Sequence, residues 1–574
     1  MIKLASCPKK YALEQDKACS PADTLHWARL RLAETGLDVL ASTRRIDTGR
    51  LAIPVYLGIC GKDAMRCMPT RKQMGKGASP QQAEASALME LVERFSFFSF
   101  WERLPNMVQA TWDEAEQAFG DTLVPLEEML FSVHDPLPPN QARRALNLVR
   151  WKFFPATCLN TQSLCQVPLD WFRKLGEFNG SSAGNTTEES LLQGLCELVE
   201  RHVCALADKS RGIFPLIETA SCTDPVLRSL VDAFAQQGIK LVLKDFSCGL
   251  PVPTVAALAW DPASFPAQSE LVFTAGTAAS PVKAAIRAIT EVAQLAGDFC
   301  TNACYEASGL PKFTCLEEVQ WLLQGPHVPL HSLPSIESDD IHDELVKLLA
   351  GLKARNYTSY SIATTHPALK IPAHYSMVPG FAFRERDANQ SLGLFIGRML
   401  AEEYDENHAT HGLTVLDALY PGAHFVPFFQ GLIELRQGKL PQAEKLFLRA
   451  YPLQPDADAR GLAAFYAAYS ATQAQEWARA LPLLDLAVQD CPEMKEYWNL
   501  RGVAHFKRKA YAEAAENFSA ALRLDKGSAL DLANLGLCYK FMGNKSEAVH
   551  CLSTALTLDP ELDFARAQLA ELTS

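Results

Sequence analysis

Paired glutamates are the residues of this chain whose type and spacing most clearly suggest chemistry. The pentapeptide ELVER occurs at Glu90–Arg94 and again at Glu197–Arg201, and each copy carries two carboxylates three positions apart. On a helix, such a pair lies on one face. Carboxylates that converge on one point repel one another unless cations neutralise them, and hard oxygen ligands select Mg²⁺ or Ca²⁺ over softer metals.

A third acidic position lies in register with the two pentapeptides. ASPVKAAIRAITEVAQ, from Ala279, aligns with ASPQQAEASALMELVE, from Ala78, and this places Glu291 on Glu90. A single ExxER is usually a solvated helical face with an intrahelical ion pair, but three copies in register favour a shared site. We therefore expect one cation-binding pocket formed by Glu90, Glu93, Glu197, Glu200 and Glu291.

Glycine loops and helix caps must position these acids. Ser79-Pro80 is a typical N-cap and first helical residue, and Thr186-x-x-Glu189 is a capping-box pattern. Helix N-termini offer N–H groups to phosphates, and Mg²⁺ normally shares its ligands with nucleotide phosphates. The sequence has no GxxxxGK[ST] P-loop. It therefore predicts a nucleotide–Mg²⁺ site built from acids, with Arg94 and Arg201 as candidate cationic contacts.

The composition narrows the class of protein. The chain has 574 residues, which is too long for one ordinary domain, and 48% hydrophobic residues, which is typical of globular proteins. A net charge of −12 argues against a general nucleic-acid binder. No apolar run is long enough to span a membrane. The 16 cysteines are scattered without a CxxC pair, which favours a reducing cytoplasm.

The two halves of the chain differ in character. The first 385 residues or so mix β-rich runs (51–59, 255–259 and 271–274) with helical stretches, which predicts an α/β or α+β domain. From about residue 425, small and apolar residues recur every 34 positions, as Gly502 and Phe518 recur at Gly536 and Leu552. This resembles the tetratricopeptide repeat (TPR), a helix–turn–helix unit of an all-α solenoid. We expect domains at 1–390 and 425–574, joined by a connecting segment at 391–424.

Residues 10–385 resemble the YcaO family. The resemblance is carried by GKGAS…SALMELVER, by NGSSAGNTTEESLLQGLCELVER, by AIRAITE and by IPAHYSMVPG at Ile371–Gly380. It implies a domain that binds ATP with several Mg²⁺ ions held by glutamates, in a fold unrelated to classical kinases. It also implies that ATP activates a backbone amide of a peptide or protein substrate.

The resemblance also implies roles for individual residues. Metal contacts fall on Glu90, Glu93, Glu189, Glu197, Glu200 and Glu291. Nucleotide contacts fall on Lys17, Thr24, Ser182, Asn185, Arg201 and Arg287. Lys17 and Thr24 are matched by their spacing alone, and the alternatives for them are a surface lysine and a helix N-cap residue. The family's mechanism needs no covalent intermediate on the protein, so no catalytic nucleophile is assigned.

In the implied mechanism, a nucleophile adds to the amide carbon, the oxyanion attacks the γ-phosphate, and phosphate then leaves. Mg²⁺ neutralises the charge on the transferred group. A Cys, Ser or Thr side chain of the substrate as nucleophile gives an azoline, and an external sulfur donor gives a thioamide.

Two departures from the family bear on the partners. The chain ends in LAELTS behind the repeats and not in a PxPxP tail, and no leader-peptide-binding domain is evident near its start. We expect a member that works with a partner recruited by the repeats, such as a TfuA-like protein in thioamidation or a substrate-delivery protein. The alternative is a non-catalytic nucleotide-binding scaffold, or an accessory factor in the methylthiolation of a ribosomal protein, that uses the repeats to recruit proteins. We expect no nucleic-acid or membrane partner, and a homodimer stays open.

Overall fold

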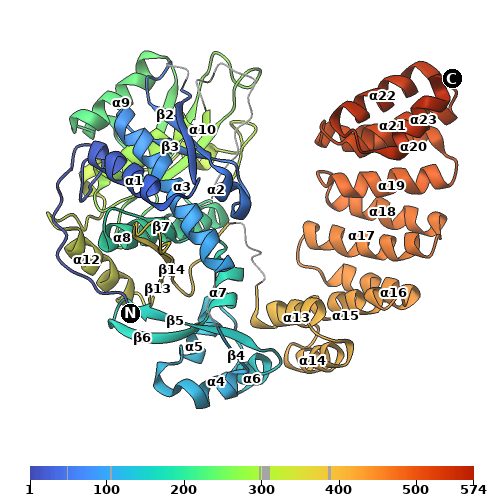
Figure 1. Ribbon diagram of the computed structural model, residues 1–574, viewed down its shortest axis with the longest axis horizontal. Coiled ribbons are helices and arrows are strands. Elements are labelled where there is room, and N and C mark those ends of the chain that lie inside the picture. The colour runs from blue at the N-terminus through green and yellow to red at the C-terminus, as the bar shows by residue number, and fades with distance from the viewer. Residues whose placement is uncertain (48–49, 104–106, 297–298, 300–309, 385–389, 574) are drawn as a thin grey trace. The chain divides into compact units, whose positions relative to one another are not determined.

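The computed structural model describes residues 1–47, 50–103, 107–296, 299, 310–384 and 390–573. The chain forms two compact units (Figure 1). Unit 1 comprises Met1–Pro136 and Arg150–Ala388, and unit 2 comprises Leu137–Val149 and Asn389–Ser574. Unit 1 mixes sheets and helices, and unit 2 is helical, so the predicted fold classes are confirmed.

The described residues of unit 1 form three sheets. The first is antiparallel, in the order β1 (Leu40–Arg45), β2 (Val55–Cys60), β3 (Lys72–Lys76). The second has the order β11 (Val272–Thr277), β10 (Thr254–Trp260), β9 (Lys240–Asp245), β8 (Leu216–Ile217), β12 (His327–Val328), and only its last pair is parallel. The third has the order β4 (Val108–Ala110), β5 (Trp151–Cys158), β13 (Tyr360–Ala363), β14 (Ala373–Met377), β7 (Ser181–Ala183), and β6 (Ser163–Pro168) also pairs with β5. The expected β-rich runs overlap β2, β10 and β11.

The helices of unit 1 lie between and around these sheets (Figure 1). They are α1 (Pro21–Thr35), α2 (Lys62–Cys67), α3 (Pro80–Glu102), α4 (Trp112–Phe119), η1 (Gly120–Thr122), α5 (Leu126–Ser132), α7 (Leu169–Gly176), α8 (Thr187–Ser210), η2 (Thr219–Ser221), α9 (Pro225–Gln236), α10 (Pro281–Ala296), α11 (Gln320–Leu323), η3 (Leu330–Ser332) and α12 (Ile341–Lys353).

The predicted loop–helix repeats are three strand–turn–helix units, β3–α3, β7–α8 and β11–α10. In two of them a strand glycine lies directly on the following helix. A Cβ on Gly75 would meet the backbone N of Ala87 at 2.0 Å, and a Cβ on Gly276 would meet that of Ala288 at 2.5 Å. Any side chain at these glycines would therefore separate the strand from its helix.

The helix caps differ in part from the prediction. Ser79 caps α3 through Gln82 N, with Pro80 as the first helical residue, as predicted. The Thr186 hydroxyl caps α8 and accepts from Glu189 N at 3.2 Å. In a complete capping box the Glu189 carboxylate would accept a hydrogen bond from Thr186 N. Here it accepts hydrogen bonds from Ala18 N and from the Asn185 side chain instead. Glu189 is therefore turned toward the N-terminal segment.

The N-terminal segment before α1 lies along the starts of all three helices. Ala5 N donates to Glu188 of α8 at 2.7 Å, and Ser79 N of the α3 cap donates to Glu14 at 2.9 Å. Lys283 of α10 donates to the carbonyl oxygen of Ala12 at 2.7 Å. These contacts fix the position of the chain around Lys17.

Unit 2 is a series of helices, most of them in antiparallel pairs (Figure 1, yellow-orange to red, with α6 in blue). They are α6 (Pro139–Leu146), α13 (Leu392–Glu403), α14 (Glu406–Leu419), α15 (Phe425–Arg436), α16 (Leu440–Ala450), η4 (Tyr451–Leu453), α17 (Ala457–Gln473), α18 (Trp477–Asp490), α19 (Lys495–Lys507), α20 (Tyr511–Leu524), α21 (Ala529–Phe541), α22 (Lys545–Leu558) and α23 (Asp563–Thr573). The segment expected to be a connection contains α13 and α14, which pack on α6 and α15.

The repeat positions pack as the 34-residue register predicts. A Cβ on Gly502 would lie 2.9 Å from the Phe518 ring, and one on Gly536 would lie 2.9 Å from Leu552. Gly502 therefore lets α19 and α20 approach closely, while Phe518 fills the space between them. None of the helices in the described part of the chain combines the length and apolar composition that a bilayer crossing requires.

Candidate functional site

A cavity of about 440 Å³ in unit 1 is lined by α3, α8 and α10, together with β3 and the N-terminal segment. This volume falls within the usual range for small-molecule sites. It brings together every site residue predicted from the sequence except Ser182: Lys17, Thr24, Glu90, Glu93, Asn185, Glu189, Glu197, Glu200, Arg201, Arg287 and Glu291.

The first acid pair lies on α3. The Ser181 hydroxyl of β7 donates to Glu93 at 2.9 Å, and Arg94 Nε lies 3.6 Å from the same carboxylate. The Arg94 guanidinium also stacks over the Phe178 ring at 4.2 Å. Burial raises the pKa of Glu93 and of Glu90, and the nearby carboxylate of Glu197 adds to the rise.

The second and third acidic positions come from α8 and α10. Glu200 accepts a hydrogen bond from Thr277 N at 2.9 Å, at the end of β11. Burial raises the pKa of Glu200, and the neighbouring carboxylate of Glu291 contributes. Glu291 itself forms an ion pair with Lys76 of β3. Burial opposes ionisation of Glu291 as well, but Lys76 and Arg201 together hold its pKa below the usual value.

The N-terminal segment and the start of α1 supply one wall of the cavity through a chain of polar contacts. The Thr24 hydroxyl donates to Asn185 Oδ1 at 3.0 Å, and Asn185 Nδ2 donates to Glu189 at 3.1 Å. Lys17 Nζ lies 3.4 Å from the same Glu189 carboxylate. Lys17 and Thr24, which were matched by their spacing alone, therefore lie in contact with two other candidate residues, Glu189 and Asn185.

Ser182 lies outside the cavity lining. Its side chain is buried against α8, where its hydroxyl shares a hydrogen bond with Ser190 at 3.2 Å. In this position the hydroxyl holds β7 against the start of α8, so we do not include Ser182 among the proposed nucleotide contacts.

The residues present fit a polyanion bound together with divalent cations. Arg201 and Arg287 line the cavity, and each has a buried Nε without a hydrogen-bond partner among the described residues. Buried donors of this kind are costly unless a ligand satisfies them. Burial raises the pKa values of Glu90, Glu93 and Glu200, and neighbouring carboxylates add to the rise, so a bound cation would stabilise their ionised forms. Guanidinium donors suit phosphate, and carboxylate oxygens suit Mg²⁺.

Several residues of the site were not selected from the sequence. Lys76 lines the cavity beside Glu291, and Gln193 accepts from Arg287 at 3.0 Å. Glu14 binds the N-terminus of α3. Lys76 lies between the two glycines of the GKGAS motif, and this position was the available signal. Gln193 and Glu14 carry no comparable pattern.

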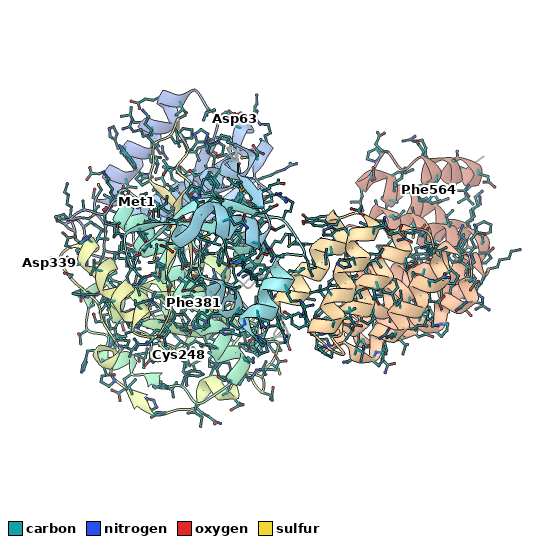
Figure 2. All side chains as sticks on the ribbon, turned by 90° about the horizontal axis from the view of Figure 1, so that it is seen from below. Met1, Asp63, Cys248, Asp339, Phe381 and Phe564 are labelled. Atoms are coloured by element: carbon teal, nitrogen blue, oxygen red, sulfur yellow. The ribbon has the colours of Figure 1, made fainter. Side chains whose placement is uncertain are left out.

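His202 follows the second ELVER directly but does not face the cavity. It is buried and stacks on Phe381, with ring centroids 4.3 Å apart (Figure 2 labels Phe381). Its Nδ1 accepts from Ala382 N at 2.9 Å, and burial lowers its pKa to about 4. His202 is therefore a neutral core residue and not an acid or base of the site.

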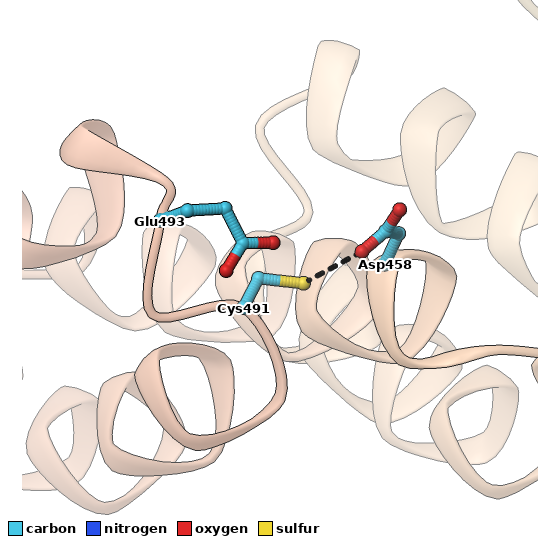
Figure 3. A group of neighbouring side chains, drawn as sticks. All are labelled: Asp458, Cys491 and Glu493. Atoms are coloured by element: carbon cyan, nitrogen blue, oxygen red, sulfur yellow. Dashed lines mark hydrogen bonds between the residues drawn. The ribbon is translucent and has the colours of Figure 1, made fainter. Parts of the chain in front are cut away.

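A second group of potential metal ligands lies in unit 2. Ligand atoms of Asp458, Cys491 and Glu493 lie within 4.8 Å of one another, and the Cys491 thiol donates to Asp458 (Figure 3). Burial, with this carboxylate acceptor, raises the pKa of Cys491 to about 12. A protonated thiol is a poor ligand, and both carboxylates are exposed to water. We therefore assign no metal to this group.

Comparison with protein families gives matches in both units. The model described as YcaO cyclodehydratase, ATP- and Mg²⁺-binding, matches residues 74–382, which is more than half of the chain. Two tetratricopeptide repeat models match residues 495–528 and 532–562. The expected cofactors, ATP and Mg²⁺, are those in the description of the YcaO model.

Individual proteins are also similar to this chain. An uncharacterised protein of Methanothermobacter thermautotrophicus is 29% identical over 48% of this chain and 70% of its own length. An "uncharacterized protein in tfuA 3'region" of Rhizobium leguminosarum bv. trifolii is 27% identical over 64% of this chain and 88% of its own length. A solved heterocyclase in complex with substrate and cofactor has a TM-score of 0.52 at 20% identity, over 67% of this chain. The match spans only 54% of that heterocyclase, and it shows a shared fold.

Proposed function

Because this chain belongs to the YcaO family, we propose that its cavity binds ATP with Mg²⁺ and that the protein uses them to activate a backbone amide of a peptide or protein substrate. The observation that carries the proposal is the convergence of carboxylates from α3, α8 and α10 on one cavity, which is also lined by Arg201 and Arg287, each with a buried Nε. Such a set is unfavourable by itself and becomes favourable around a nucleotide with divalent cations.

In this proposal, the acidic residues hold the metal and the cationic residues hold the phosphates. Glu90, Glu93, Glu189, Glu197, Glu200 and Glu291 supply oxygen ligands to Mg²⁺. Arg201, Arg287 and Lys17 donate to phosphate oxygens, while Thr24 and Asn185 hold the N-terminal wall in place. Bound ATP supplies the phosphoryl group that makes the amide oxygen a leaving group.

The contribution of the protein is orientation and electrostatics. The acids and arginines are fixed on long helices, so their dipoles and charges need little reorganisation during reaction. The surrounding core lowers the local dielectric and strengthens each charge interaction. Cys19 lines the cavity, but burial raises the pKa of its thiol, which disfavours a protein nucleophile. We therefore propose no covalent catalyst on the protein.

The product class and the partner are the finer parts of the proposal. Substrates that attack with their own side chain give azolines, and an external sulfur donor gives thioamides. We favour thioamidation with a TfuA-like partner, because the relative with the tfuA-region description aligns along most of its own length. The repeats of unit 2 are proposed to recruit that partner or the substrate, as helical solenoids present extended surfaces to proteins.

Turnover and product mass test this proposal. ADP release is measured with the full-length protein, with and without candidate peptides, and with Glu90→Gln as the site variant. Peptide-stimulated release in the wild type alone is expected. Intact-mass analysis of co-expressed peptides then separates the products, because an azoline loses one water and a thioamide exchanges oxygen for sulfur. Equal background release in both proteins, with unchanged peptide masses, would instead indicate a nucleotide-binding scaffold.

A further inference from the structure

Lys76 occupies a position fixed by two glycines. It ends β3, where it pairs with Val55 of β2. Gly75 before it and Gly77 after it both lie against α3, since a Cβ on Gly77 would meet Ala83 N at 2.7 Å. The backbone is therefore held on both sides, and the Lys76 side chain reaches the cavity, where it lines the wall.

The Lys76 ammonium acts on acids from all three helices. It forms an ion pair with Glu291 of α10. Its charge also lowers the pKa of Glu90 on α3 and of Glu200 on α8, against the larger effect of burial. The Lys76 side chain is 20% exposed and that of Glu291 is 14% exposed, so the pair faces the cavity and not the closed core.

A lysine in this place could pair with two different anions, the Glu291 carboxylate and a phosphate of a bound nucleotide. Its ammonium is a compact charge on a flexible four-carbon stem, so it can leave one anion for another without moving the backbone. Glu291 is one of the proposed Mg²⁺ ligands, and a metal bound there would take over the neutralisation of its carboxylate. Phosphate oxygens in the same cavity would then be the nearest new partners for the ammonium.

We propose that Lys76 is the resident counter-ion of the acid cluster: it neutralises Glu291 in the metal-free protein, releases it when Mg²⁺ is bound, and then contacts a phosphate of the nucleotide. This inference rests on the proposed function. It assigns to Lys76 opposite effects on the two ligands, because the same charge repels the metal and attracts the phosphates.

Because Lys76 should weaken Mg²⁺ binding and strengthen nucleotide binding, its replacement should change the two affinities in opposite directions. Binding of Mg²⁺ alone, and of a non-hydrolysable ATP analogue at saturating Mg²⁺, is measured by calorimetry for the full-length wild type and for Lys76→Met. We expect Lys76→Met to bind Mg²⁺ several-fold more tightly and the analogue about tenfold more weakly, as for one lost charge-assisted hydrogen bond. Lys72→Met is the matched control, because Lys72 lies on the same strand, is exposed and is outside the cavity lining. It should change neither affinity.

Other outcomes are equally decisive. If Lys76→Met weakens both ligands, or changes neither, while the wild type binds both, the counter-ion role is overturned and the proposed function stands. If the wild type binds neither ligand, both proposals fail. Lys76→Arg keeps the positive charge and therefore separates the loss of that charge from a general effect of substituting Lys76. The affinity of Lys76→Arg for the ATP analogue should be closer to that of the wild type than the affinity of Lys76→Met is. Thermal unfolding of each variant without ligands checks that the fold is retained.

Discussion

Lys76 and Glu291 form an ion pair inside the cavity although 215 positions separate them in the chain. The pair joins the β3–α3 unit to the β11–α10 unit, and Glu200 of α8 accepts from Thr277 N at the end of β11. All three strand–turn–helix units are thus linked by contacts of their own acidic residues. The pattern that repeats in the sequence therefore marks the three units whose acidic residues meet in the cavity.

The two ELVER arginines should differ in their effect on nucleotide binding. Arg94 already interacts with Glu93 and Phe178, whereas Arg201 has a buried Nε without a partner among the described residues. We expect Arg201→Gln to weaken binding of an ATP analogue by about tenfold or more, from the loss of a charge-assisted hydrogen bond. Calorimetric titration of Arg94→Gln beside it should show a smaller loss. A larger loss for Arg94→Gln would reverse the assignment.

The glycine of the first turn should contribute to the stability of the fold. A Cβ on Gly77 would come 2.7 Å from Ala83 N, so Gly77→Ala must push the loop away from α3. We expect it to destabilise the protein by about 1–3 kcal/mol, as overpacking usually does, and to lower the midpoint of urea unfolding. Gly212→Ala is the matched control, because the nearest atom to its Cβ would be 3.7 Å away. Equal midpoints for the two variants would refute the close-packing explanation.

Removing the last repeats should separate nucleotide binding from partner recruitment. Repeat units contact mainly their neighbours, so deletion of 495–574 should leave the preceding helices and unit 1 folded. We expect unchanged affinity for an ATP analogue and loss of peptide or partner capture in a pull-down with the co-expressed candidates. Retained capture would show that unit 1 alone recognises the substrate.

Much of the fold followed from patterns in the sequence. The 34-residue register predicted the packing of Gly502 on Phe518 because such solenoids repeat one local contact. The caps Ser79 and Thr186 predicted where α3 and α8 begin. The helices α13 and α14 were missed because they lie outside the repeat register, and their packing on α6 joins segments distant in sequence.

The site was predictable where it repeats and not where it depends on contacts between distant segments. Glu90, Glu197 and Glu291 share a pattern, so their convergence could be expected. Ser182 has the right residue type, but its hydroxyl bonds Ser190 and does not reach the cavity. Lys76 was visible only as a lysine between two glycines. Its partner Glu291 became evident only when β3 and α10 were seen together.

The central claim is that the clustered carboxylates hold a nucleotide through Mg²⁺, and Glu90→Gln tests it most directly. Glu102→Gln is its control, because Glu102 is an exposed glutamate at the end of the same helix. Affinity for a non-hydrolysable ATP analogue is measured by calorimetry with Mg²⁺ and with EDTA. We predict Mg²⁺-dependent binding in the wild type and in Glu102→Gln, and a loss of at least about tenfold in Glu90→Gln, as expected when one charged ligand contact is removed. Binding that is equally strong in EDTA, or unchanged in Glu90→Gln, would contradict the account.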